Sequence, residues 1–230
     1  MELIDALRTT GSVRNFTDQP IPDQLVFDVL NDARFAPSGG NRQAWNVIVV
    51  KDRVRRQAIG DYYLDAWHDY VGHVLAGLIP FSPLASQGDR DLASSKRDDA
   101  IAVSKPDGFP ETLAGVPVLL VVCADLRFLA ATDRDLGHYQ IAGGASIYPF
   151  VWSILLAAHD RGIGGVMTTV ATRKEPDLRA LLELPDDVIV ASIVALGYPE
   201  QLHTKLKRNA VTDFTTIDAF NGPAFGPTPT

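Results

Sequence analysis

The 230-residue sequence has one cysteine, Cys123, so no disulfide can form within a chain and no cysteine cluster can hold a metal. Basic residues are also scarce: 21 Lys and Arg stand against 28 Asp and Glu, a formal net charge of −7. A uniformly acidic chain repels nucleic acid and anionic membranes, so we expect neither as a partner. We expect Cys123, which lies in the apolar run PVLLVVCAD, to be a buried core thiol.

Long apolar runs and a secretion signal are missing too. No stretch reaches the roughly 20 apolar residues that a membrane-spanning helix needs. The N-terminal residues MELIDALRTT include early acidic residues and lack the apolar run of a signal peptide. We therefore expect a soluble cytoplasmic protein.

Several common catalytic motifs are absent. The sequence has no phosphate loop of the type G-x-x-x-x-G-K-[ST] and no H-E-x-x-H, and its five histidines show no spacing typical of metal ligands, so we expect no metal site. The segment GASIY has Tyr148 where a hydrolase elbow needs its second glycine. In GIGGVM, Met167 replaces the third glycine of a dinucleotide-binding fingerprint.

The apolar pattern predicts a mixed fold. With 46% hydrophobic residues, the chain can form one large domain or two small ones. Helical spacing is found after Asp23, from residue 53 to about 78, and over 140–160, where Pro149 suggests a kink. Three wholly apolar runs predict strands buried inside a sheet: WNVIVV, PVLLVVCAD and VIVASIVALG. Such strands need helices on both faces, so the class is α/β or α+β.

Two regions do not fit a simple core. Residues 80–112 are polar, and a loop longer than about 15 residues is uncommon unless it is a lid or is mobile. The tail beyond Gly197 has little apolar periodicity and cannot bury itself. It either frays or packs on something else, such as a second copy of the chain.

Three segments carry candidate binding groups. GSVRNF contains Ser12 and Arg14, PSGGNRQAW places Asn41 and Gln43 after two glycines, and KLKR is a basic cluster in an acidic chain. The glycines let a ligand approach the backbone, and the two amides suit a flat heterocycle. KLKR suits a phosphate. The alternatives are a solvated arginine, a polar turn plugged by a tryptophan, and a solvated tail.

Taken in order, five segments resemble the nitroreductase family of FMN-dependent oxidoreductases: SVRNF, ARFAPSGGNRQAWNVIVV, GASIYPFVWSILLAAHDRGIGG, LRALLELPDDVIVASIVALGYP and KR. The resemblance runs from about Leu7 to Phe214 and leaves out residues 60–115. It implies an α+β three-layer sandwich in which helices flank a central, mainly antiparallel sheet. It further implies an intertwined homodimer with two FMN sites in its interface. Residues 1–230 would form a single FMN-binding domain, with 60–115 as a lid-like excursion and 203–230 as a C-terminal arm.

The resemblance also implies roles for residues in the first half of the site. Ser12 and Arg14 match the N-terminal motif that holds the phosphate and ribityl end of FMN. Ser38, Gly39 and Asn41 match the segment that reaches the flavin of the opposite subunit.

The remaining cofactor residues are matched in the same way. Gln43 would support the turn that contains Asn41, and Ser146 falls where many members carry a glutamine facing the ribityl chain. Met167, Thr168 and Thr169 match the stretch along the isoalloxazine ring. Lys207 and Arg208 match the C-terminal phosphate contacts. Thr10 departs from the family pattern, because an arginine is common there, and Arg8 is a candidate substitute.

The implied activity is hydride transfer from NADPH or NADH through FMN to a nitroaromatic or quinone-like acceptor. We assign no catalytic side chain, because N5 of the flavin carries out the chemistry. Trp67, Tyr70 and Phe81 could stack on the acceptor, or they could simply form the core of the lid. Two alternatives remain: a dehydrogenase- or dehalogenase-type member of the same fold, and a flavin-binding or flavin-storage protein.

Overall fold

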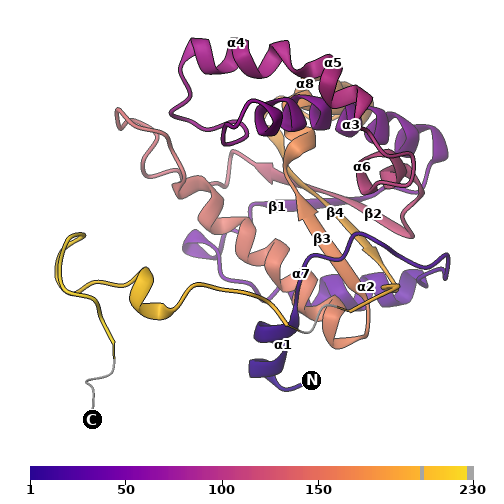
Figure 1. The fold of residues 1–230 in the computed structure, drawn as a ribbon. Helices are drawn as coiled ribbons and strands as arrows, with labels where there is room; N and C mark the ends of the chain where they lie inside the picture. The colour runs from indigo at the N-terminus through magenta and orange to yellow at the C-terminus, as the bar shows by residue number, and fades with distance from the viewer. Residues whose placement is uncertain (203–204, 227–230) are drawn as a thin grey trace.

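The protein is an α+β sandwich, seen here in a computed structural model that describes residues 1–202 and 205–226 (Figure 1). Its sheet has the order β1-β2-β4-β3, and every neighbouring pair is antiparallel. The strands are β1 (Trp45–Val49), β2 (Val118–Asp125), β3 (Gly164–Thr168) and β4 (Val188–Gly197). Helices cover both faces of the sheet, so the expected three-layer architecture is confirmed.

The two core layers follow from the alternation of side chains along the central strands. Leu120 and Val122 of β2 pack against α2 (Asp23–Ala33) and α7 (Tyr148–Asp160). Leu119, Val121 and Cys123 face the other way, toward α3 (Arg53–Leu75) and α8 (Glu175–Leu181). Burial raises the pKa of the Cys123 thiol to about 11, which confirms an inert core thiol.

Shorter helices complete the chain. α1 is Leu3–Thr9, and in the described residues 3₁₀ turns lie at Gly39–Asn41, Leu113–Gly115, Ala142–Ser146, Val170–Lys174 and Val211–Asp213. Residues 80–112, expected as a long polar loop, instead contain α4 (Gln87–Ser95), α5 (Arg97–Ala102) and α6 (Phe109–Thr112). A capping box between Ser86 and Asp89 starts α4. None of the described helices is both long and apolar enough to span a membrane.

Three expectations about the strands and helices were wrong. β1 lies at the edge of this chain's sheet and pairs only with β2 among the described strands, because an apolar run does not reveal how many neighbours a strand has. The helix expected over 140–160 begins at Tyr148, so Pro149 starts it and does not kink it. β3 was not anticipated, because its two glycines resemble a turn.

The C-terminal segment leaves the body of the molecule. Residues 205–226, yellow in Figure 1, run past α7 and α1 and away from the sheet. Phe220 is 95% exposed, and Phe214 and Phe225 are also exposed. The expected arm covers 203–230, of which 203, 204 and 227–230 lie outside the described residues. A single chain therefore leaves these aromatic side chains in solvent.

Gly165 of β3 allows the closest packing in the sheet. A Cβ added there would lie 2.5 Å from a methyl carbon of Leu196 and 3.1 Å from the Ala195 carbonyl oxygen. We predict that Gly165→Ala lowers the free energy of unfolding by about 1–3 kcal/mol, the usual effect of overpacking. Urea denaturation measures this. Gly115→Ala is the control, because a Cβ at Gly115 meets nothing within 4 Å; equal losses in both variants would contradict the prediction.

Candidate functional site

The N-terminal motif lies along the outer edge of β3. Ser12 forms a parallel bridge with Gly165, and the Val13 N–H donates to the Gly165 carbonyl oxygen at 2.9 Å. Further along, Phe16 bridges to Pro199 beyond the end of β4. Ser12 and Arg14 are exposed on this segment, whereas Val13 is buried. The chain therefore presents a hydroxyl and a guanidinium beside the edge of the sheet.

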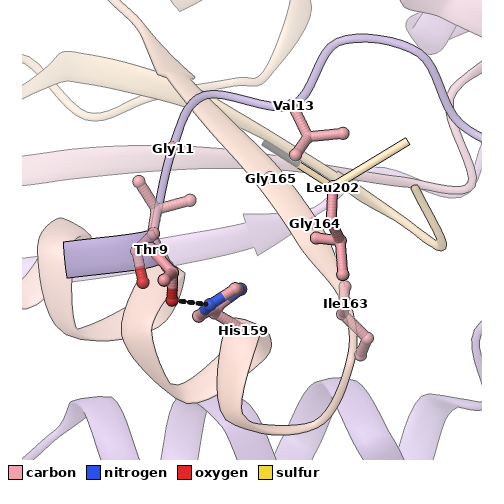
Figure 2. A pocket seen from close by; sticks show the side chains of 10 residues that line it. Thr9, Gly11, Val13, His159, Ile163, Gly164, Gly165 and Leu202 are labelled. Atoms are coloured by element: carbon pink, nitrogen blue, oxygen red, sulfur yellow. Dashed lines mark hydrogen bonds between the residues drawn. The ribbon is translucent and has the colours of Figure 1, made fainter. Parts of the chain in front are cut away.

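The inner side of this motif is closed to ligands. Thr9 and Gly11 pack against His159 and Gly164 around a cavity of about 10 Å³ (Figure 2). The Thr9 hydroxyl and the His159 Nε2 are 2.8 Å apart. Since a cavity of this size holds at most about one water, a ligand has room only on the outer side, with Ser12 and Arg14.

Thr10 does not take over the role of the arginine that is common at this position in the family that the sequence resembles. Its side chain is buried, and its hydroxyl donates to the Ala6 carbonyl oxygen at 2.7 Å. Arg8 lies exposed in the last turn of α1. Thr10 therefore brings no charge to an anion at this motif, and Arg14 and Arg8 are the exposed cations of this segment.

Tyr63 of α3 contacts the end of β3. Tyr63 of α3 is 2% exposed, and the Thr168 hydroxyl donates to the Tyr63 hydroxyl oxygen at 3.4 Å. Burial raises the pKa of Tyr63, and the hydrogen bond with Thr168 acts in the opposite direction. α3 and the end of β3 thus meet at this pair of hydroxyls.

The outer edge of β3 is free beyond Gly165. The Gly165 carbonyl points outward to Val13, so by alternation the backbone N–H and C=O of Met167 point outward as well. No described residue bonds to these two groups, and the Met167 side chain is 39% exposed. A strand edge with an unpaired donor and acceptor suits the polar edge of a flat ring.

The Ser38–Gln43 loop has an unusual backbone. Gly40, Asn41 and Gln43 all adopt left-handed conformations, with φ of 60°, 53° and 51°. The Gln43 side-chain amide donates to the side-chain oxygen of Asn41 at 3.3 Å, and the Gln43 N–H donates to the Ser38 hydroxyl at 3.0 Å. Left-handed non-glycine residues cost free energy, and such strain concentrates at binding sites.

Ser146 supports this loop from below. It is buried, and its hydroxyl accepts the Gly39 N–H at 3.0 Å. A Cβ at Gly39 would lie 3.4 Å from that hydroxyl oxygen, so glycine lets the loop pack closely against Ser146. Within one chain, Ser146 therefore acts on the loop itself.

The loop and the β3 edge do not meet in one chain. β1 and β3 lie at opposite edges of the sheet with two strands between them, about 14 Å at the usual spacing. Trp45 pairs with Ala124, which pairs with Ile189 of β4, whereas Thr168 pairs with Ile193 of β4. The four-residue offset between Ile189 and Ile193 separates the two groups by about a further 13 Å along the strands. A ligand that touches both groups at close range requires two chains.

Lys207 and Arg208 lie on the C-terminal segment, and both are exposed. The Arg208 guanidinium donates to the Lys207 carbonyl oxygen at 2.7 Å. Neither residue, nor Arg14, forms an ion pair with any acidic residue in residues 1–202 and 205–226. Their positive charges remain available to an anion.

The aromatic residues expected over the acceptor pack on one another. Trp67 and Tyr70 stack with ring centres 4.7 Å apart, and Phe81 lies 6.4 Å from Tyr70. The guanidinium of Arg173 lies 5.0 Å from the centre of the Phe81 ring. All three expected residues are half-buried, so each keeps some exposed surface.

A large open groove of about 980 Å³ lies between the N-terminal loop and the start of α3. Arg14 and Arg53 line it, but so do Asp107 and Glu200, so its charge is mixed. Arg56, also in its wall, binds the backbone carbonyls of Ala114, Val50 and Val116 and therefore serves the fold. Its mixed lining gives the groove no clear selectivity.

Comparison with known proteins identifies the family. The model of the Nitroreductase family matches residues 7–198. The chain belongs to the nitroreductase family. Nitrobenzene nitroreductase of Ectopseudomonas oleovorans is 25% identical over 224 residues, covering 93% of this chain and 95% of that protein. Iodotyrosine deiodinase 1 of Pongo abelii is 25% identical over 209 residues, covering 90% of this chain and 65% of that protein.

Solved structures confirm the nitroreductase fold. The nitroreductase-like family protein from Bacillus cereus superposes with a TM-score of 0.62 at 20% identity, covering 94% of this chain and 96% of that one. Oxidized iodotyrosine deiodinase bound to FMN and 3-iodo-L-tyrosine superposes with a TM-score of 0.62 at 20% identity. The match covers 91% of this chain and 96% of that one. The resemblance in the sequence is therefore confirmed, and oxidoreductase chemistry is the activity that the family relationship supports.

The sequence did not reveal two residues of the site. Tyr63 was visible only as one of several aromatics in a helix, and no pattern linked it to Thr168. His159 was one of five unassigned histidines; the structure buries it against Thr9. Both depend on contacts between segments about 100 or more residues apart, which local spacing does not encode.

We predict that Ser146→Ala destabilises the Ser38–Gln43 loop. The N–H of Gly39 would lose its part-buried acceptor, and such a hydrogen bond typically contributes about 0.5–1.5 kcal/mol. Chemical denaturation should show this loss, and hydrogen exchange at residues 39–43 should accelerate. Ser153→Ala is the control, because the Ser153 hydroxyl bonds only within α7, to the Pro149 carbonyl oxygen. Unchanged exchange in Ser146→Ala would contradict the assignment.

His159 should make stability depend on pH. Burial lowers the pKa of His159, so the folded state resists protonation more than the unfolded state does. The contribution of neutral His159 to folding stability is therefore fully present above the ordinary histidine pKa. This contribution is lost as the pH falls through the lowered pKa of the folded state. The thermal midpoint of unfolding should decrease as the pH is lowered from about 7.5 to about 5.5. The thermal midpoint of His159→Gln should decrease less steeply over the same range. Parallel pH profiles for the two proteins would refute this.

Proposed function

We propose that the protein is an FMN-dependent oxidoreductase that takes hydride from NADH or NADPH and passes it to a flat acceptor, such as a nitroaromatic or a quinone. The observation that carries the proposal is the unpaired edge of β3 at Met167, flanked by Arg14 without an acidic partner. The family membership and the FMN in a structure of the same fold support it.

The residues present fit the anionic end of FMN. A phosphate in a partly buried site needs cationic partners, and the acidic chain keeps Arg14, Lys207 and Arg208 free of acidic partners in its described part. Ser12 adds a hydroxyl next to Arg14. Thr10 adds nothing to this set, since its hydroxyl bonds within α1.

The ring of FMN fits the β3 edge. The outward backbone groups of Met167, followed by Thr168 and Thr169, would hold the polar edge of the ring and fix its orientation. FMN supplies the hydride-transfer chemistry when bound. Donors near the ring would offset the negative charge gained on reduction, as preorganised donors do in other enzymes. No protein side chain is required to transfer the hydride.

A homodimer would complete the site. The partner's Ser38–Gln43 loop would supply Ser38, Gly39, Asn41 and Gln43, which cannot reach the β3 edge of their own chain. Ser146 would hold that loop in its strained shape. The exposed Phe214, Phe220 and Phe225 of the C-terminal segment would then bury themselves on the other chain.

The acceptor would lie on the exposed face of the ring, under the aromatic group of Trp67, Tyr70 and Phe81. Their half-buried rings offer a flat apolar surface, and Arg173 beside Phe81 would attract an acceptor that carries negative charge. Movement of residues 60–115 as a lid, and the cytoplasmic location, remain parts of this proposal.

Reductive dehalogenation is a second candidate. It is favoured by the similarity to iodotyrosine deiodinase 1, which covers 90% of this chain. Anaerobic turnover with a nitroaromatic, compared with turnover of a halogenated phenol, distinguishes the two. A storage protein is distinguished by flavin that stays oxidised with NADH and NADPH.

We predict that Arg14→Gln weakens FMN binding by about ten- to a hundredfold, because a hydrogen bond to a charged group contributes about 1.5–3 kcal/mol. Quenching of FMN fluorescence during titration of FMN-free protein measures the dissociation constant. Arg55→Gln is the matched control, since Arg55 pairs with Glu183 at the surface. Wild-type protein that binds no FMN, or binds FMN that NADH and NADPH leave oxidised, would contradict the proposed function.

A further inference from the structure

Arg173 carries a positive charge that no acidic residue offsets in the described part of the chain. It lies exposed in the 3₁₀ turn Val170–Lys174, directly after the Met167–Thr169 stretch. Its guanidinium forms no hydrogen bond and no ion pair within residues 1–202 and 205–226. Glu175, the nearest acidic residue in the sequence, pairs with Arg179 at 3.5 Å. The N–H donors of Arg173 are therefore free to bind an anion.

Two other basic residues of this region are already paired. Lys174, the next residue in the chain, forms an ion pair with Asp65 of α3. Arg97 of α5 binds both Asp65 and Asp69. These two carboxylates are thus engaged, and they hold α5 and the 3₁₀ turn against α3. Arg173 is left as the cation of this cluster that can meet an incoming ligand.

The ring of Phe81 holds Arg173 in position. The guanidinium carbon lies 5.0 Å from the ring centre. Phe81 has a left-handed backbone with φ of 53°, which is an outlier for so bulky a residue. Its ring packs against His73 and Tyr70, with ring centres 4.8 Å and 6.4 Å away. Backbone strain of this kind costs free energy and clusters at ligand-binding sites, so Phe81 fits a ring that is placed to receive a ligand.

A row of aromatic rings connects Phe81 with the end of β3. The hydroxyls of Thr168 and Tyr63 are 3.4 Å apart, and Trp67 stacks on Tyr63 with ring centres 6.2 Å apart. Trp67 and Tyr70 stack at 4.7 Å, and Phe81 follows Tyr70. The exposed parts of the half-buried rings therefore form an apolar surface that leads from the end of β3 toward the guanidinium.

The length of this path fits a small aromatic molecule. The Thr172 N–H donates to the Thr169 carbonyl oxygen at 3.0 Å, so the chain turns tightly after β3. At about 2 Å per residue in a 3₁₀ turn, the segment from Thr169 to Arg173 spans about 8 Å. That span is comparable with the length of one benzene ring and its substituents. A ring docked at the β3 edge can therefore place a substituent against Arg173.

We propose that the acceptor is an aromatic acid, whose ring lies on the aromatic row and whose anionic group pairs with Arg173. A carboxylate matches the two parallel N–H groups of a guanidinium, which makes arginine suited to this class of ligand. The inference rests on the proposed function and narrows its substrate class from flat acceptors in general to negatively charged ones. Arg173 is then a specificity-determining residue and takes no part in the hydride transfer.

The expected effect is moderate, because Arg173 is exposed and water screens the pair. Loss of the pair should reduce kcat/KM for an anionic acceptor by about five- to tenfold. The pair is the same before and during the reaction. The loss should therefore appear as a higher KM with little change in kcat.

The test uses the FMN-loaded protein with 4-nitrobenzoate and with 4-nitrobenzamide, which has a similar shape and no charge. Arg173→Gln removes the charge, and Arg173→Lys keeps it without the planar fork. Arg55→Gln is the control, because Arg55 pairs with Glu183 and lies about 22 Å from Tyr70 along α3. The dissociation constants of benzoate and benzamide, which have no nitro group to reduce, are measured from the change in flavin absorbance.

We expect the wild-type protein to prefer nitrobenzoate over nitrobenzamide by about five- to tenfold, and to bind benzoate more tightly than benzamide. Arg173→Gln should lose both preferences through a higher KM and a weaker affinity for benzoate. Arg173→Lys should lose less, and Arg55→Gln should keep both preferences.

Four results would overturn the inference: no preference in the wild-type protein, an equal loss for both acceptors in Arg173→Gln, equal losses of the preference in Arg173→Gln and Arg173→Lys, or a rise in KM for NADPH alone. The last result would mean that Arg173 serves the phosphates of the nicotinamide cofactor. In all four cases the proposed function stands. Wild-type protein that binds no FMN, or whose FMN stays oxidised with NADH and NADPH, removes both.

Discussion

The close contact between the N-terminal motif and the glycines of β3 and β4 is the constraint on which the site depends. A Cβ at Gly164 would lie 2.9 Å from Val13, and one at Gly197 would lie 2.6 Å from Phe16. Only glycine lets the chain lie against the sheet here, which leaves Ser12 and Arg14 on the outside. The same contact closes the inner side of the motif around His159, so the side chains of Ser12 and Arg14 face solvent on the outer side.

The sheet order then determines what one chain can do. β3 and the Ser38–Gln43 loop lie at opposite edges, so in the proposed function a single chain would hold two half-sites that do not meet. One half offers Ser12, Arg14 and the free edge of β3. The other offers a strained, amide-rich loop on the Ser146 hydroxyl. Isolated positive charges in an acidic chain and a C-terminal segment with exposed aromatics are consistent with a site that two copies complete.

Much of the fold could be predicted from the sequence, because β2 and β4 are apolar enough to identify buried strands and α2 has clear helical spacing. The edge position of β1 could not, since its composition matches that of a central strand. β3 could not be predicted, because Gly164 and Gly165 are typical of a turn. Pro149 was compatible with either a kink within a helix or the start of one. In the candidate site, the motif residues could be identified from the order of the family-like segments. Tyr63 and His159 could not, because they contact residues that are far away in the sequence.

The most direct test of the central claim is light scattering coupled to size-exclusion chromatography on FMN-loaded protein, with flavin absorbance recorded in the same peak. The account predicts that flavin elutes with a species of twice the chain's mass and one FMN per chain. Flavin that co-elutes in the same ratio with a single chain would contradict the shared site.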